Sequence, residues 1–184
     1  ISSVVPQITT IVKLAVEKIL KKNVLVVGAG IKTGLNIRID NPAQLGSDLV
    51  VDSVAAIVEY PAPLLIFDLG TANTVCVIDK NKNYIGGMIY PGIGVSLDSL
   101  TAHASQLGGI SIEAPEHMIG KNTTECMKSG LIYSSAAAMD GIIDRLQEQL
   151  GGEATVIATG GLAKKIVPHC RREIILDDDL LLKG

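Results

Sequence analysis

The chain has 184 residues, of which 47% are hydrophobic and 19% are charged, and this composition excludes a highly charged disordered chain. Sixteen Lys and Arg residues against nineteen Asp and Glu residues give a net charge of −3, which disfavours binding to nucleic acid or to an anionic membrane. Aromatic residues make up only 3%, which also disfavours base-stacking platforms and aromatic carbohydrate clefts.

The first 60 residues combine short apolar runs with two helical patterns. The apolar runs predict strands over residues 1–5, 24–27 and 35–39. A first helix is expected after Pro6, because apolar residues recur at helical spacing from Ile8 to Ile19. The Gly-Ala-Gly turn at 28–30 lacks a third glycine and a following helix, which argues against a dinucleotide fingerprint. Since the chain starts with Ile1 and its first strand leads straight into a helix, we expect it to begin in the middle of a fold.

A second helix is expected from about Asp48, with an apolar face. That face comprises Val50, Val51, Val54, Ala55 and Val58. Asp48 and Asp52 lie on the opposite face, one turn apart near the helix N-terminus, where the helix dipole favours ionised carboxylates. Two interpretations of Asp48 remain open, a solvated residue that starts the helix and a functional carboxylate.

The segment 60–63, with two prolines, predicts a connector between two units, residues 1–62 and 63–184. The second unit opens with strands that short turns join in antiparallel fashion, at 64–67, 75–78 and 84–89. Helices at 95–104 and 124–150, a strand at 155–158, a short helix and a strand at 174–176 follow. The long helix carries a predicted apolar stripe of Met127, Leu131, Ala138, Ile142, Leu146 and Leu150. This order indicates a layered α/β domain with a mixed sheet flanked by helices.

Two polar loops follow strands in this unit. Asp68, Gly70 and Thr71 form a hairpin tip at which the backbone can approach a phosphate, and Asp68 can hold a cation. Gly160 and Gly161 lie between a strand and a helix, where ligands often bind in layered folds. Ordinary turns are the alternative for each loop. Together the two loops resemble the arrangement in the acetate and sugar kinase, heat-shock protein and actin group, whose fold is actin-like (ribonuclease H-like).

A narrower resemblance covers essentially the whole chain. The segments that carry it, in order, are 41–48, 67–74, 86–100, 119–130, 158–163 and 181–184. They resemble the type III pantothenate kinases. The resemblance implies ATP-dependent phosphorylation of pantothenate, the first step of coenzyme A synthesis, in a cytoplasmic homodimer that uses Mg²⁺ and a monovalent cation, K⁺ or NH₄⁺.

The resemblance also implies roles for individual residues. Asp48 corresponds to the proton acceptor, Asp68 to the monovalent-cation ligand and Thr123 to a pantothenate contact. Gly70, Thr71, Gly160 and Gly161 are the implied nucleotide-binding residues, and Gly46, Ser47, Asp48 and Leu49 line the implied substrate site. The long helix at 124–150 is the candidate dimer interface, with a role inside the core as the alternative.

The chain departs from the family pattern at three places. Leu49 stands where the family has arginine after the aspartate, and Ile39 stands near the position of a substrate-contacting tyrosine. The family's N-terminal Asp-x-Gly-Asn-Thr phosphate loop has no counterpart here. Two alternatives therefore stay open: a relative that keeps the fold without catalysis, and a kinase for another small hydroxylated substrate.

The cysteines and histidines carry no motif. Three widely spaced cysteines, Cys76, Cys126 and Cys170, indicate reduced thiols, and we expect all three to be buried. The three histidines lack zinc-ligand spacing. No apolar run reaches the roughly 18 residues that cross a bilayer, and no signal peptide is recognisable.

Overall fold

The centre of the fold is a mixed six-stranded sheet. The computed structural model describes residues 1–3, 5–28 and 31–184, and it gives the strand order β1-β4-β3-β2-β5-β6. The strands are β1 (Asn36–Ile37), β2 (Leu64–Leu69), β3 (Ala72–Ile78), β4 (Asn83–Pro91), β5 (Thr155–Thr159) and β6 (Ile175–Leu176). The predicted antiparallel arrangement of β2, β3 and β4 is confirmed. β5 runs parallel to β2, so the carboxyl ends of these two strands meet at one edge of the sheet.

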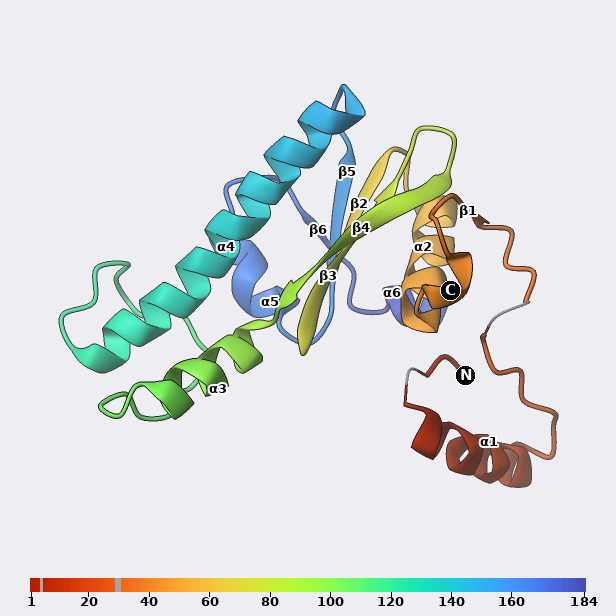
Figure 1. Ribbon diagram of the computed structural model, residues 1–184, viewed down its shortest axis with the longest axis horizontal. Helices are drawn as coiled ribbons and strands as arrows, with labels where there is room; N and C mark the ends of the chain where they lie inside the picture. The colour runs from red at the N-terminus through yellow and green to blue at the C-terminus, as the bar shows by residue number, and fades with distance from the viewer. Residues whose placement is uncertain (4, 29–30) are drawn as a thin grey trace.

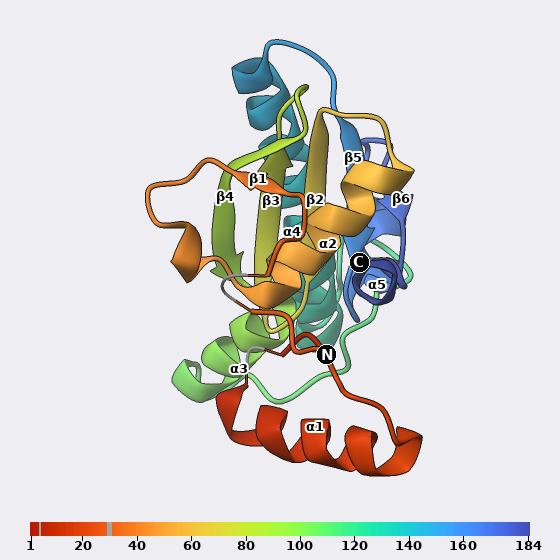
Figure 2. The ribbon, with the colours of Figure 1, turned by 90° about the vertical axis from the view of Figure 1, so that its right-hand side faces the viewer.

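Helices cover both faces of this sheet. They are α1 (Pro6–Leu20), α2 (Ser47–Glu59), α3 (Ile93–His103), α4 (Thr123–Leu150), α5 (Ala163–Ile166) and α6 (Leu180–Lys183), with short 3₁₀ turns η1 (Pro42–Gln44) and η2 (Val167–His169). Figures 1 and 2 show α2 and α6 on one face and α4 on the other. None of the helices in the described part of the chain is long and apolar enough to cross a bilayer.

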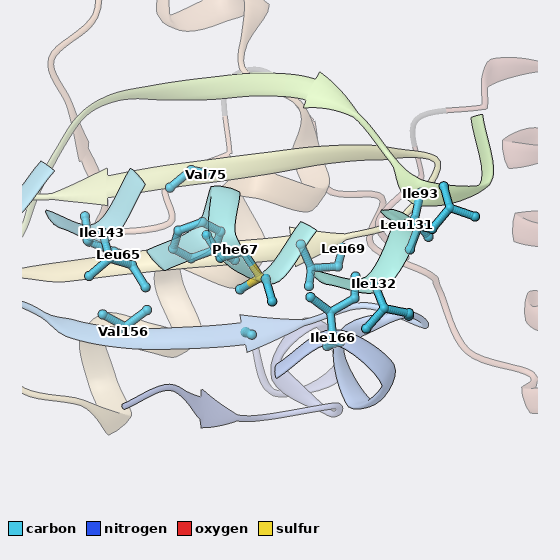
Figure 3. Packing of buried hydrophobic residues seen from close by; sticks show 14 of the residues in the cluster. Leu65, Phe67, Leu69, Val75, Ile93, Leu131, Ile132, Ile143, Val156 and Ile166 are labelled. Atoms are coloured by element: carbon cyan, nitrogen blue, oxygen red, sulfur yellow. The ribbon is translucent and has the colours of Figure 1, made fainter. Parts of the chain in front are cut away.

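The alternation of side chains along β2 creates two separate cores. Leu65, Phe67 and Leu69 pack towards α4, as Figure 3 shows, whereas Leu64 and Ile66 join the cluster under α2. Successive side chains of a strand point to opposite faces. Asp68, which comes directly after Phe67, therefore belongs to the α2 face of the sheet.

The buried face of α4 differs from the predicted stripe. Met127 and Leu131 are buried as expected, but Ala138 is exposed. The buried face continues instead through Ala136, Met139 and Ile143. Residues 136–138 are three consecutive alanines, so the sequence pattern cannot tell which of them faces the core, and packing against the sheet decides.

The N-terminal segment also differs from expectation. The described residues of 1–5, and all of 24–27, form no strand, whereas the predicted strand at 35–39 is reduced to β1. The amino group of Ile1 donates to the Leu25 carbonyl at 2.7 Å, and the Val27 N–H donates to the Ile1 carbonyl at 2.8 Å. Two such bonds bring the segments together without making a ladder. Val4, Ala29 and Gly30 lie outside the described residues.

Helix α1 has the predicted bounds, but its apolar face packs against no core. Ile8, Ile11 and Ile19 are all at least half exposed. Figures 1 and 2 show α1 standing apart from the sheet, beyond the edge where β2 and β5 end. On α2, Val58 is likewise exposed although the helical pattern predicts it in the apolar face.

The three thiols have different environments. Cys76 is buried, and burial raises its pKa to about 12, so this thiol is a neutral part of the core. Cys170 is half-buried and its pKa is also raised to about 12, mainly by burial. Cys126, in the first turn of α4, is exposed to solvent. The prediction of burial is therefore wrong for this residue.

Candidate active site

The first turn of α2 carries the first carboxylate of the site. Gly46 precedes the helix as its N-cap, Ser47 is its first residue, and Asp48 is half-buried. An Asp48 carboxylate oxygen accepts a hydrogen bond from the Leu49 N–H at 2.9 Å. The Leu49 side chain packs against the hydrophobic cluster under α2. The helix dipole therefore acts on Asp48, while Leu49 contributes packing.

Asp52 lies one turn further along α2 and is almost completely buried. Only 1% of its surface is exposed, although the helical pattern places it on the face opposite the apolar one. One of its carboxylate oxygens, Oδ1, has no hydrogen-bond partner in the described part of the chain. A buried polar atom without a partner is costly and rare in native proteins. Its presence indicates a place where the protein is built to receive something polar.

A row of polar side chains crosses the sheet under this helix. Asp68 in β2 is in register with Thr74 of β3 and with Thr159 of β5. Residues opposite one another in a sheet share a face, so all three belong to the face that α2 covers. Thr74 Oγ1 is buried and has no partner among the described residues. The carboxyl end of the β2–β5 pair is therefore polar in an otherwise apolar sheet.

A cavity of about 390 Å³ opens at this edge. Its lining comprises Asp52, Asp68, Thr159, Gly160, Gly161, Lys164, Asp178 and Leu181. The structure thus brings Asp68 of the first predicted loop together with Gly160 and Gly161 of the second. Asp48 stands close enough for its charge to act on both Asp52 and Asp68. Three aspartates from α2 and β2 therefore share one region.

Burial and mutual repulsion change the protonation of these aspartates. Burial, and to a smaller extent the charges of Asp68, Asp48 and Asp177, together raise the pKa of Asp52 to about 7. Burial also raises the pKa of Asp68, and the neighbouring Asp48 raises it further. Burial is the largest cause for both carboxyls, and the neighbouring negative charges add repulsion to it. A bound cation would relieve this repulsion.

We expect the Asp52→Asn variant to have a different dependence of stability on pH from the wild type. The folded-state pKa of Asp52, about 7, lies above its ordinary value of 3.8, which applies to the unfolded chain, so the folded protein holds one more proton between these two pH values. The contribution of Asp52 to wild-type stability is thus fully present below about pH 4 and is lost as the pH rises through about 7. At about 1.4 kcal/mol per pKa unit, the loss is a few kcal/mol, about 4 at most.

The measurement is the free energy of urea unfolding of both proteins at pH 5 and pH 8. The difference in the free energy of unfolding, Asp52→Asn minus wild type, should be larger at pH 8 than at pH 5, because asparagine has no charge to bury. Parallel behaviour of the two proteins across this range would contradict a buried, proton-holding Asp52.

The predicted phosphate hairpin is a tight turn with a firm support. Gly70 and Thr71 connect β2 to β3, and the Thr71 carbonyl accepts a hydrogen bond from the Gly92 N–H at 3.0 Å. A Cβ on Gly92 would lie 2.2 Å from the Gly70 carbonyl oxygen, so a side chain does not fit there. A Cβ on Gly70 would meet nothing closer than 3.5 Å. A Cβ on Gly70 would thus make only ordinary van der Waals contacts, whereas Gly92 is a supporting residue that sequence reasoning missed.

The second glycine loop is locked onto the first. Gly160 has φ +93°, and a Cβ there would lie 2.5 Å from Asp68 Oδ1 and 2.7 Å from the backbone nitrogen of Leu69. The Leu162 N–H donates to the Leu69 carbonyl at 3.3 Å. Glycine is required at 160 because the backbone turns into the left-handed region and passes directly over Asp68. By contrast, nothing lies within 4 Å of a Cβ on Gly161.

None of the predicted substrate residues Gly46, Ser47, Asp48, Leu49 and Thr123 lines the cavity at the ends of β2 and β5. Thr123 is exposed at the start of α4, which covers the face of the sheet opposite to α2 (Figure 1). Ser47 lines a separate, mainly apolar cavity of about 280 Å³ between the 27–37 segment and α2. Within one chain, the structure therefore does not bring Thr123 to Asp48.

The carboxylates suit a hard cation that takes part of its coordination from another source. Asp52 offers an unpaired buried oxygen, and Asp68 lines the same cavity. Among the described residues no group of three or more His, Cys, Asp or Glu side chains is arranged to hold a metal ion. Mg²⁺ is commonly bound by one or two carboxylates, with phosphate oxygens and water completing its shell. The residues present fit that arrangement.

Sequence reasoning missed part of the cavity lining. Lys164 and Asp178 lie 96 and 110 residues after Asp68, and no motif marks them. Thr159 lies in the segment 158–163, but no motif marks it as a site residue. Its position at the end of a strand is the feature that could have identified it, because β5 runs parallel to β2 and Thr159 is in register with Asp68.

Comparison with solved structures supports the fold alone. A protein from Campylobacter jejuni described as a Baf family transcriptional activator aligns with a TM-score of 0.56 and 21% identity, over 92% of this chain and 74% of its own. The ethanolamine utilization protein EutJ from Carboxydothermus hydrogenoformans aligns with a TM-score of 0.53 and 16% identity, over 96% of this chain and 70% of its own. The predicted actin-like class, a mixed sheet flanked by helices, is confirmed.

Sequence comparison identifies the family. The profile of the type III pantothenate kinases matches residues 1–145. A type III pantothenate kinase from Bacillus cytotoxicus is 46% identical over all 184 residues, which span 70% of its length. Since the profile covers most of the chain and the alignment covers all of it, the chain belongs to the type III pantothenate kinase family.

Proposed function

We propose that this chain transfers the γ-phosphoryl group of ATP to the primary hydroxyl of pantothenate, giving 4′-phosphopantothenate in the first step of cytoplasmic coenzyme A synthesis. Membership of the family supports this reaction. The observation that carries it is that Asp68 lines one cavity with Gly160 and Gly161, while Asp48 lies close enough for its charge to act on Asp68. Phosphoryl transfer depends mainly on positioning and on charge stabilisation, which such a site can supply.

In this proposal Asp48 accepts the proton of the attacking hydroxyl. A carboxylate in the first turn of a helix is held in one place and stays close to the cavity without being sealed from it. Gly70 and Thr71 of one loop, with Gly160 and Gly161 of the other, bind the nucleotide phosphates through their backbone N–H groups, and the space beside Gly161, where nothing lies within 4 Å of a Cβ, leaves room for them. Asp68 holds a monovalent cation, K⁺ or NH₄⁺. A divalent ion, when bound with the nucleotide, neutralises the charge of the transferring phosphate.

The substrate end of the site rests on Gly46, Ser47, Asp48 and Leu49, which surround the start of α2. Leu49 packs against the core and offers no charge to the pantothenate carboxylate. This feature favours, as a second candidate, a kinase of the same fold for another small hydroxylated substrate. The two candidates differ only in the acceptor.

The test is detection of phosphopantothenate by mass spectrometry after incubation of the purified chain with ATP, Mg²⁺, K⁺ and pantothenate. Product at an ordinary kinase rate is the expected result. ATP turnover with another hydroxylated compound, but none with pantothenate, would replace the proposed substrate. Nucleotide binding without turnover on any acceptor would contradict the proposed activity and favour a non-catalytic relative.

We further propose a homodimer in which Thr123 serves the site of the partner subunit. The exposure of Thr123 and its place across the sheet from Asp48 support this, because one chain alone does not join the two residues. We also propose that, within each chain, residues 1–62 belong to the N-terminal and residues 63–184 to the C-terminal actin-like domain. If Thr123→Ala and Asp48→Asn each lower activity, mixing the two variants should restore up to about a quarter of it, since mixed dimers contain one intact site. Activity that stays at the level of the separate variants after subunit exchange would contradict shared sites.

A further inference from the structure

The cavity at the ends of β2 and β5 has an unbalanced charge. Three of its lining residues, Asp52, Asp68 and Asp178, are acidic. Of the lining residues that the structure describes, Lys164 is the one with a basic side chain. A nucleotide polyphosphate would add several negative charges. A basic side chain in this cavity can offset them by donating charged hydrogen bonds to the phosphate oxygens.

The backbone that carries Lys164 is held firmly against the floor of the cavity. Lys164 follows Gly160, Gly161 and Leu162, and Gly160 passes directly over Asp68. The Leu162 N–H donates to the Leu69 carbonyl, and the Lys165 N–H donates to the Leu162 carbonyl at 3.0 Å. The root of the Lys164 side chain is therefore placed in a defined position relative to Asp68, while its four-carbon stem stays free to move.

The present partner of Lys164 is easily exchanged. Its ammonium group forms an ion pair with Asp178, and the two side chains are 70% and 41% exposed. Exposed ion pairs contribute at most about 1 kcal/mol. The neighbouring lysine behaves differently, because Lys165 Nζ donates to the Ile112 carbonyl at 2.8 Å and does not line the cavity. Of these two adjacent lysines, only Lys164 lines the cavity.

We propose that Lys164 binds the nucleotide phosphates directly, and that Asp178 holds its ammonium group in the free protein and competes with the nucleotide for it. The proposal rests on the proposed kinase function, since it assumes that the nucleotide occupies this cavity. It adds a basic residue, and a carboxylate that opposes it, to the acidic and glycine-rich parts of the site.

Calorimetric titration with ADP, ATP and adenosine, each with MgCl₂, tests this inference. The Lys164→Ala variant should bind ADP and ATP about tenfold or more weakly, because a hydrogen bond from a charged donor is lost, while binding of adenosine should not change. Lys164→Arg should recover part of the affinity. Asp178→Asn should strengthen ADP binding by up to about fivefold, the equivalent of the exposed ion pair. Lys165→Ala, which makes the same change in net charge, is the matched control and should bind like the wild type.

Each other outcome counts against the inference. Equal affinity of Lys164→Ala and wild type for ADP would overturn it, as would an equal loss in Lys165→Ala, which would indicate a general charge effect. A matching loss for adenosine would mean damage to the fold, and circular dichroism of each variant provides an independent check. If the wild-type chain binds neither ADP nor ATP, both the inference and the proposed function fail, whereas normal wild-type binding with an unaffected Lys164→Ala overturns the inference alone.

Discussion

Replacing Asp48 by asparagine is expected to lower kcat by about 10²- to 10⁴-fold, the usual contribution of a positioned general base. Asparagine keeps the shape of the side chain but cannot accept the proton of the substrate hydroxyl. The hydrogen bond from the Leu49 N–H can be kept by the amide oxygen, so α2 should fold normally. The KM for ATP should change little, because the nucleotide loops lie on other elements.

The measurement is steady-state kinetics of phosphopantothenate formation, with Asp98→Asn as the control. Asp98 is exposed on α3 and does not line the cavity at the ends of β2 and β5. Its substitution therefore removes the same charge from a surface outside that cavity. A loss smaller than threefold for Asp48→Asn in a well-folded preparation would rule out Asp48 as the base. A similar loss in both variants would attribute the effect to net charge.

The Gly160→Ala substitution is expected to destabilise the fold by about 2 kcal/mol or more and to abolish nucleotide binding. A φ of +93° is strained for any residue with a Cβ and costs about 1–3 kcal/mol. The added Cβ would also lie 2.5 Å from Asp68 Oδ1 and 2.7 Å from the Leu69 backbone, too close for either to remain in place. The carboxylate that lines the cavity and the glycine loop would both shift.

Gly161→Ala provides the matched comparison one residue away. Nothing lies within 4 Å of a Cβ at this position, and its φ is outside the left-handed region, so its stability should stay within about 0.5 kcal/mol of the wild type. Urea unfolding and ADP titration measure both effects. If the two alanine variants have the same stability and affinity, the close contact between Gly160 and Asp68 does not shape the site.

The elements that the sequence predicted well are those with strong local patterns. Helix α2 begins at Ser47, as the acidic start and the apolar spacing of its residues indicate, and the antiparallel strands β2 to β4 follow from short turns between apolar runs. The family could also be predicted, because its motifs lie in order along the chain. Residues Asp48, Asp68, Gly160 and Gly161 were all found in this way as candidates.

The tertiary structure alone decided which side chains are buried and which distant residues meet. The pattern of α2 places Asp52 on the face opposite the apolar one, but that face turns towards Asp68 and away from water, so this carboxyl is only 1% exposed. In the same way, the run of three alanines in α4 does not show which of them is buried, and only the packing of the helix on the sheet decides this. The described residues of the apolar runs at 1–5 and 24–27 form no strand, because a strand needs a neighbour to pair with.

The sequence by itself thus determined helices α1 to α5, the antiparallel strands β2 to β4, the two glycine loops and the family, whose motifs are each local in the chain, but it missed α6. The tertiary structure decided that Asp68 meets Thr159 and Gly160, about 90 residues later, and that Lys164 and Asp178 join them. Parallel pairing of β2 with β5 makes these contacts. Such pairing has no local signal, since its free energy comes from the packed sheet as a whole.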